Sequence, residues 1–144
     1  MIIDLIRIRL QSVRGKLENR VAISTPKAPG YLKFMSQAIK VGNLLFTGGS
    51  VPRDPKTLEI PVRFEDQAEL VFRNLEAIAE AAGTSLKTAI KVTVFLTDIR
   101  NWEKMNSYYN KYFTGDPPPA RSTIQVAALN NQYQIEVEAV ILIP

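Results

Sequence analysis

The sequence predicts an α+β domain in which one face of a single sheet is covered by two helices. Short segments of alternating apolar and polar residues predict strands near the start, in the middle and at the end of the chain. Two longer segments with helical spacing lie between them. At 144 residues and 46% hydrophobic composition, the chain has the length of one domain with a core of its own.

The first half of this domain begins with a strand at residues 21–23, followed by a proline-marked loop at residues 24–30. Residues 38–41 and 44–47 then flank Gly42 and Asn43, which suit the tight turn of a β-hairpin. Gly48 and Gly49 follow directly, where glycine permits close approach by a ligand but is as common in a simple bulge or turn. Residues 53–56 are expected to form a turn.

Two helices are predicted from apolar residues at helical spacing. The first covers residues 66–82 and ends at Gly83, a typical C-terminal cap. The second covers about residues 101–113, with Asp98 as its cap, and its inward stripe is interpreted as core. That stripe contains Trp102, Met105, Tyr109, and Tyr112 or Phe113.

Three further strands are expected. Residues 90–96 alternate with Ile90, Val92, Val94 and Leu96 on the buried face. Residues 122–126 and 133–143 are expected to pair as a hairpin. The last strand also carries apolar residues on its outer face, which two helices would leave uncovered, so the sequence predicts an oligomer with sites in the clefts between subunits. Those outer residues are Val140 and Leu142.

The absence of histidine and cysteine limits the chemistry. Without them the chain cannot form a Ser-His-Asp triad, a cysteine nucleophile or a Cys/His zinc site. An oxygen-only Mg²⁺ or Ca²⁺ site stays formally open, but the sequence has no acidic loop of the kind that binds Ca²⁺. We therefore expect a site with no metal and no cofactor, in which Glu, Asp, Lys, Tyr or water acts as acid or base.

The net charge of +4 is concentrated at the N-terminus, because residues 1–20 contain five basic and two acidic side chains. The remaining body is almost neutral, which argues against a nucleic-acid-binding groove. We divide the chain into an extension, residues 1–19, and a domain, residues 20–144. The extension fits a strand or a helix and leaves an organellar transit peptide open. Lack of cysteine and of a long apolar segment favours a soluble, cytoplasmic protein without a membrane partner.

A stiff proline run leads into Arg121, at the start of a predicted strand. A permanently charged planar guanidinium in a fixed place suits the binding of a carboxylate. Glu136 lies on the next strand, so the expected hairpin would bring an anion clamp and a carboxylate base together. A cross-strand salt bridge between the two explains the same pattern equally well.

Several segments, in order along the chain, resemble the Rid family of reactive intermediate (enamine/imine) deaminases, also called YjgF. The resemblance runs from about Arg20 to the C-terminus. The segments that carry it are residues 24–29, 36–47, 91–98, 119–122 and 135–139.

This resemblance implies a chorismate-mutase-like α+β fold, a homotrimer, and three active sites in clefts between subunits. It implies that Arg121 binds the substrate carboxylate and that Glu136 positions or activates the attacking water. The other substrate-binding positions that it implies are Gly49, as a backbone contact, and Asn106, Pro119 and Ala120, as cleft walls. Met35 stands where the family has a tyrosine that packs on the substrate, and Gly48 where it often has serine, so the size and polarity of the substrate are open.

The resemblance implies hydrolytic deamination of reactive 2-imino or enamine acids, such as 2-aminoacrylate, to 2-keto acids and ammonia. The activity would be that of a 2-iminobutanoate/2-iminopropanoate deaminase, a hydrolase of metabolite damage control. Two alternatives stay open: an RNA-binding endoribonuclease that inhibits translation, and a non-catalytic regulatory module that binds a small acid.

Overall fold

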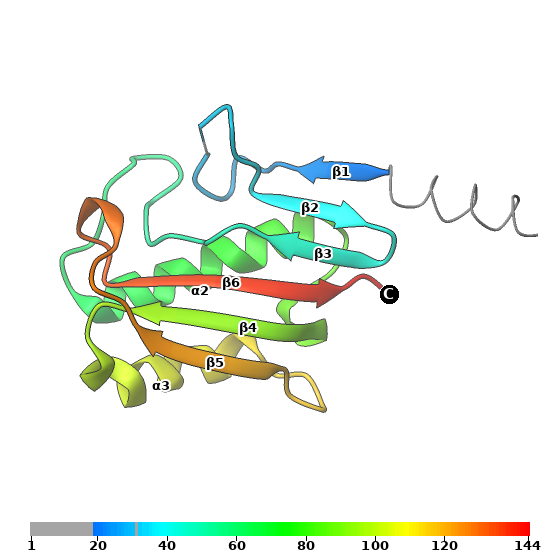
Figure 1. Cartoon of the computed structure of the whole chain (residues 1–144). Coiled ribbons are helices and arrows are strands. Elements are labelled where there is room, and N and C mark those ends of the chain that lie inside the picture. The colour runs from blue at the N-terminus through cyan, green and yellow to red at the C-terminus, as the bar shows by residue number, and fades with distance from the viewer. Residues whose placement is uncertain (1–18, 31) are drawn as a thin grey trace, which may run out of the picture.

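A computed structural model describes residues 19–30 and 32–144. Residues 1–18 of the predicted extension, residues 1–19, therefore lie outside the described residues. Six strands form one mixed sheet in the order β1-β2-β3-β6-β4-β5. Two helices lie behind it (Figure 1). The elements are β1 Arg20–Ile23, β2 Ala38–Val41, β3 Leu44–Thr47, α2 Phe64–Ala81, β4 Ala89–Leu96, α3 Trp102–Tyr112, β5 Ala120–Gln125 and β6 Ile135–Leu142, with short 3-10 turns η1 Leu86–Thr88, η2 Ile99–Asn101 and η3 Asn130–Gln132.

The predicted hairpin between the last two strands is wrong. β5 pairs with β4 in parallel, and β6 lies antiparallel between β3 and β4. The reason is that β4, α3 and β5 form a β-α-β unit, in which the helix carries the chain back so that the second strand runs parallel to the first. The segment after β5 then crosses to the middle of the sheet through η3, where Asn131 and Gln132 have left-handed backbone angles.

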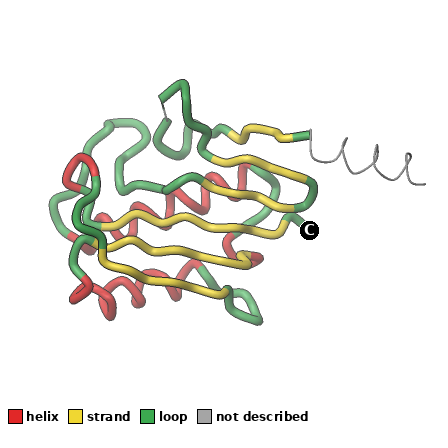
Figure 2. The backbone as a smooth tube through the Cα atoms, viewed as in Figure 1, coloured by secondary structure: helices red, strands yellow, loops and turns green. Residues whose placement is uncertain are grey.

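The core lies between the sheet and its two helices, and no helix of the described residues covers the other face of the sheet (Figures 1 and 2). The predicted inward stripe of α2 is confirmed, because Val71, Phe72 and Leu75 are fully buried. The helix ends as predicted: Gly83 has a φ of 81° and its N–H donates to the carbonyl of Glu80. In β6 the residues that point to the helices are buried and those between them are partly or fully exposed.

Two residues that the sequence predicts to face the core, Ile90 and Trp102, are exposed instead. Ile90 is 46% exposed, because the register of β4 against β6 shifts between Ala89 and Lys91 and this bulge takes Ile90 out of the alternation. Trp102 is 37% exposed at the first position of α3, whereas Met105 is fully buried as expected.

The uncovered face of the sheet carries several exposed apolar side chains. The exposed apolar residues on the strands of this face include Phe46, Ile124 and Leu142.

Within the described residues, no helix is long and apolar enough to cross a membrane.

Candidate functional site

Arg121 projects from β5 toward α3, where three side chains hold its guanidinium. Its Nη1 donates to Oδ1 of Asn106 at 2.8 Å. The guanidinium carbon lies 4.5 Å from the ring centroid of Tyr109 and 5.5 Å from that of Trp102. We call these four residues the Arg121 cradle. The other guanidinium nitrogens bond to no described residue, so the fork keeps donors for a carboxylate in a fixed orientation.

Glu136 lies on the uncovered face of β6, at the wall of a pocket of about 530 Å³. Burial raises the pKa of its carboxyl, and the nearby Glu138 carboxylate raises it further. The carboxylate makes no hydrogen bond or ion pair with the described part of the chain. We call this the Glu136 pocket; among its lining residues are Met35, Ser36, Gly49, Val51, Arg53, Tyr133 and Glu136. A raised pKa brings a carboxylate closer to the range in which it works as a base near neutral pH.

Gly49 belongs to this pocket for a steric reason. A Cβ atom at position 49 would overlap the carboxylate of Glu136. Only glycine therefore lets the backbone after β3 pass so close to this side chain. The sequence left open whether Gly48 and Gly49 permit approach by a ligand or form a bulge or turn; the close approach seen at Gly49 is to a side chain of the same molecule.

Arg121 and Glu136 do not meet within one chain, contrary to the expectation from a hairpin. Arg121 lies opposite Val92 of β4, and Glu136 lies opposite Phe95. Paired residues point to the same face of a sheet, and successive residues of a strand alternate between faces. Positions 92 and 95 are three apart, so Arg121 points to the helix-covered face and Glu136 to the uncovered one. A salt bridge between them within the chain is excluded for the same reason.

The other predicted site residues divide between these two places. Met35, which is 51% exposed, and Gly49 line the Glu136 pocket. Asn106 holds Arg121, and Pro119 and Ala120 directly precede it at the start of β5. The structure thus brings Asn106 to Arg121, and Met35 and Gly49 to Glu136, while β4 lies between the strands that carry Arg121 and Glu136.

Sequence reasoning missed several residues that surround these groups. The aromatic stripe of α3 was interpreted as core, yet Tyr109 and Trp102 also flank the guanidinium of Arg121. Arg53 was assigned to a turn, although it lines the Glu136 pocket. The alternation of residues 49–53 could have indicated that Arg53 faces the pocket. Ser50 and Pro52 are buried, and the alternate residues Gly49, Val51 and Arg53 line the pocket.

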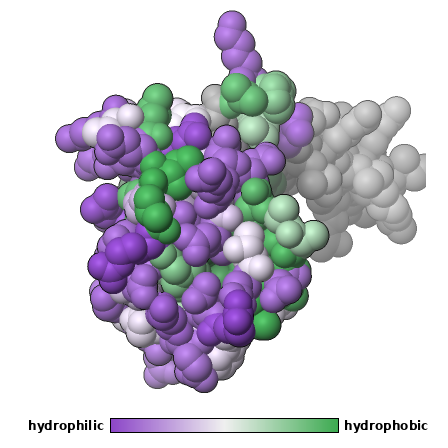
Figure 3. All heavy atoms as spheres, turned by 90° about the vertical axis from the view of Figure 1, so that its left-hand side faces the viewer, coloured by the Kyte–Doolittle hydropathy of each residue, from purple (hydrophilic) through white to green (hydrophobic). Residues whose placement is uncertain are grey.

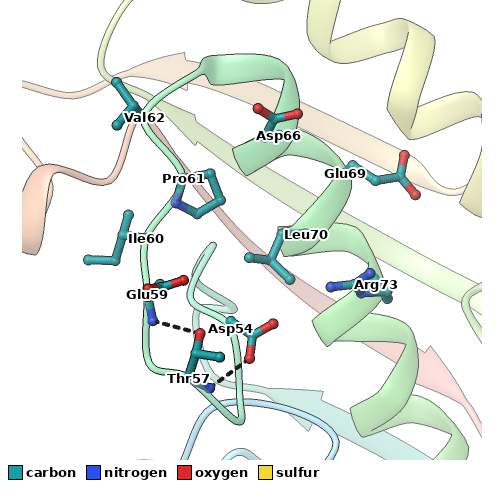
Figure 4. A pocket seen from close by; sticks show the side chains of 10 residues that line it. All are labelled: Asp54, Thr57, Glu59, Ile60, Pro61, Val62, Asp66, Glu69, Leu70 and Arg73. Atoms are coloured by element: carbon teal, nitrogen blue, oxygen red, sulfur yellow. Dashed lines mark hydrogen bonds between the residues drawn. The ribbon is translucent and has the colours of Figure 1, made fainter.

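A second hollow, of about 710 Å³, lies between α2 and the loop before it (Figure 4). Asp66, Glu69 and Arg73 of α2 form one wall. Glu69 is already engaged by the hydroxyl of Tyr112 at 2.6 Å. None of the predicted site residues reaches this hollow, and no group of three His, Cys, Asp or Glu side chains in residues 19–30 and 32–144 could hold a metal ion. We therefore assign it no part in the chemistry.

The end of the molecule that carries the loops after β3 and before β6 is seen in Figure 3. Its surface is mostly polar, and the apolar side chains form separate patches between the polar ones.

The chain is similar in sequence to several known proteins. The family model described as Endoribonuclease L-PSP matches residues 25–143. A RutC family protein of Pyrococcus horikoshii is 47% identical over 119 residues, which are 82% of this chain and 94% of that protein. TdcF of Escherichia coli, provisionally named a reactive intermediate deaminase, is 39% identical over 120 residues, which are 82% of this chain and 93% of TdcF.

Solved structures agree with these sequence matches. RidA from an Antarctic Psychrobacter species superposes with a TM-score of 0.82 at 41% identity, covering 86% of this chain and 100% of RidA. The structure of E. coli TdcF with bound serine superposes with a TM-score of 0.79 at 38% identity, covering 85% and 98%. The matches in sequence and in fold show that the chain belongs to the Endoribonuclease L-PSP family, which is the Rid or YjgF family that its motifs resemble.

Proposed function

We propose that the protein hydrolyses reactive 2-imino acids, and the enamines from which they form, to 2-keto acids and ammonia. The observation that carries this proposal is the partly desolvated Glu136 carboxyl in a pocket, together with a guanidinium whose orientation is fixed in the Arg121 cradle. Family membership supports it, since TdcF is provisionally named a reactive intermediate deaminase. The relevant activity is that of a 2-iminobutanoate/2-iminopropanoate deaminase.

The chemistry requires only groups that this chain contains. Arg121 would bind the α-carboxylate through two N–H donors and so fix the imine carbon next to Glu136. Glu136 would take a proton from water as the water oxygen bonds to that carbon, and the proton would then pass to the nitrogen. Collapse of the tetrahedral carbinolamine releases ammonia and leaves the keto acid. Such acid-base assistance contributes about 10²- to 10⁴-fold, which suffices for a bond that water already cleaves.

We further propose that each site is completed by two copies of the chain within a homotrimer. Arg121 and Glu136 face opposite sides of one sheet, so a single copy cannot present both to one substrate. In a ring of copies, the Arg121 cradle of one subunit can face the Glu136 pocket of the next. The exposed apolar side chains on the uncovered face of the sheet supply surface for such contacts.

The activity is tested by generating imino acids with an amino-acid oxidase and following release of the keto acid. Arg121→Ala should lower kcat/KM by about 10²-fold, because a bidentate charge-assisted contact is lost. Arg100→Ala, at an arginine whose side chain is 88% exposed and which lies outside both halves of the site, is the matched control. An Arg121→Ala protein as active as the wild type would rule out this assignment.

The shared site is tested by mixing two inactive variants. Arg121→Ala and Glu136→Gln subunits, refolded together in equal amounts, should regain about one quarter of the wild-type activity, because random assembly of a ring gives that share of intact sites. If each site were contained in one chain, no mixture would recover activity. Size-exclusion chromatography with light scattering measures the expected trimer directly.

The family description makes an endoribonuclease the second candidate function. The basic residues 1–20, which carry +3 of the net charge, are the segment that would bind RNA. Deletion of residues 1–19 should then abolish RNA binding and cleavage while deamination is unchanged. Binding of small acids without turnover of any imine would instead indicate the third candidate, a regulatory binding module.

A further inference from the structure

Arg53 lines the Glu136 pocket and has no role in the hydrolysis proposed above. Its guanidinium carbon lies 5.9 Å from the centroid of the Tyr133 ring. Its Nε is buried without a hydrogen bond, and the side chain forms no ion pair with any described residue. Because Nε is enclosed, only the Nη end of the fork is available to a ligand.

The backbone that carries Arg53 is held firmly. Ser50 exchanges two backbone hydrogen bonds with Val137, of 2.7 and 3.1 Å, next to Glu136 on β6. The side-chain amide of the buried Asn74 donates to the carbonyls of Val51 and Arg53, both at 2.9 Å. Arg53 is therefore anchored both to the strand that carries Glu136 and to α2, as a residue that selects a ligand must be.

Arg53 is not the counter-ion of Glu136. The pKa of Glu136 is raised by burial and by Glu138, whereas a guanidinium in contact would lower it. The pocket thus contains a guanidinium and a carboxylate that do not neutralise each other. A half-buried guanidinium without an anionic partner among the described residues is the kind of group that binds a negatively charged ligand.

We propose that Arg53 binds a second carboxylate, so that the protein prefers imino acids with an acidic side chain of one or two methylene groups, such as the imines of aspartate and glutamate. This inference rests on the proposed function, in which Arg121 of a neighbouring subunit takes the α-carboxylate. Arg53 then binds the side-chain carboxylate of the same molecule. A pocket of about 530 Å³ has room for such a substrate.

The test compares pairs of substrates that differ in one charge. Imines of glutamate and aspartate are compared with those of glutamine and asparagine, which have nearly the same shape. The wild type should favour the acid over the amide. Arg53→Met keeps an apolar stem on Tyr133 and should lower kcat/KM for the acids by about 10- to 100-fold, with about twofold change or less for the amides. Arg53→Lys should have a kcat/KM for the acids between those of the wild type and Arg53→Met, since lysine keeps the charge but not the forked guanidinium.

Arg63→Met, at a side chain that is 71% exposed outside the pocket, is the matched control and should keep the wild-type preference. An equal loss of kcat/KM for the acid and amide imines in Arg53→Met would overturn the proposal for Arg53, and so would a wild type that prefers the amide imines. In either case, hydrolysis of neutral imines would still support the proposed function.

If no imine is hydrolysed, the proposed function fails, and binding then decides the role of Arg53. Calorimetric titration with 2-oxoglutarate and with 2-oxopentanoate, which lacks the second carboxylate, should show tighter binding of the former to the wild type. That difference should disappear in Arg53→Met; a difference that persists unchanged, or is missing from the wild type, contradicts the proposal.

Discussion

In the Arg121 cradle the charged group is surrounded by partners, whereas in the Glu136 pocket the two charged groups, Arg53 and Glu136, have no ionic partner among the described residues. A guanidinium fixed by an amide and two rings is ready to bind and changes little on doing so. A desolvated carboxyl with a raised pKa is instead ready to exchange a proton. The two regions therefore suit the different tasks that we propose for them, which are binding the substrate and acting on it.

The largest effect is expected at the carboxyl of the Glu136 pocket. Glu136→Gln keeps the shape but removes the base, so kcat should fall by about 10²- to 10⁴-fold while KM changes little. Glu138→Gln is the control, because Glu138 lies two residues along β6 on the same face and is exposed. Steady-state kinetics at pH 8 measures both. A fall in both variants alike would show that the charge of this surface, and not the base, matters.

The second-largest effect is expected at Gly49, whose backbone lies close to the Glu136 carboxyl. Gly49→Ala places a methyl group where the Glu136 carboxylate lies, so the side chain must move and kcat should drop by about 10-fold or more. If Gly49 acts through Glu136, the double variant with Glu136→Gln should be no less active than Glu136→Gln alone. Additive losses in this double-mutant cycle would mean that Gly49 contributes separately, for example by its backbone.

A smaller effect is expected in the Arg121 cradle. Asn106→Asp keeps an acceptor for Arg121 but adds a negative charge that competes with the substrate carboxylate. KM should rise by about 10-fold with kcat nearly unchanged. Asn110→Asp, one turn further along α3 and exposed, controls for the added charge. Were kcat to fall instead of KM rising, the cradle would take part in the chemical step and the division of tasks would be wrong.

The smallest expected effect is on stability. The pKa of Glu136 is raised in the folded protein above the ordinary glutamate value of 4.5, so protonation favours folding and the stabilising contribution is lost as pH rises through the raised pKa. Glu136→Gln should therefore have the higher melting temperature at pH 8, by no more than a few degrees because the carboxyl is half exposed, and the gain should shrink at pH 4. Thermal unfolding at the two pH values checks the sign, and a variant less stable than the wild type at pH 8 would contradict it.

Much of the fold could be predicted because burial follows local periodicity. The hairpin around Gly42, the buried face of α2 and the alternation of β6 all appear in the structure as the pattern indicates. The bulge at Ile90 could not be predicted, since Ile90 is apolar and stands in phase with Val92 and Val94, so the alternation runs on across the bulge. Trp102 and Tyr109 were correctly placed on one helix, but the pattern could not indicate that a guanidinium lies over their rings.

By itself, the sequence determined the class of the fold, the family, and the two residues on which the chemistry is proposed to depend. The class of the fold followed because apolar spacing specifies which residues share a face. The family and the roles of Arg121 and Glu136 followed from motifs that resemble the Rid family in order along the chain. Only the tertiary structure decided that β5 pairs with β4, and hence that Arg121 and Glu136 face opposite sides of the sheet. It also placed Arg53 beside Tyr133 in the Glu136 pocket. Strand pairing depends on contacts between segments distant in sequence, which local periodicity does not encode.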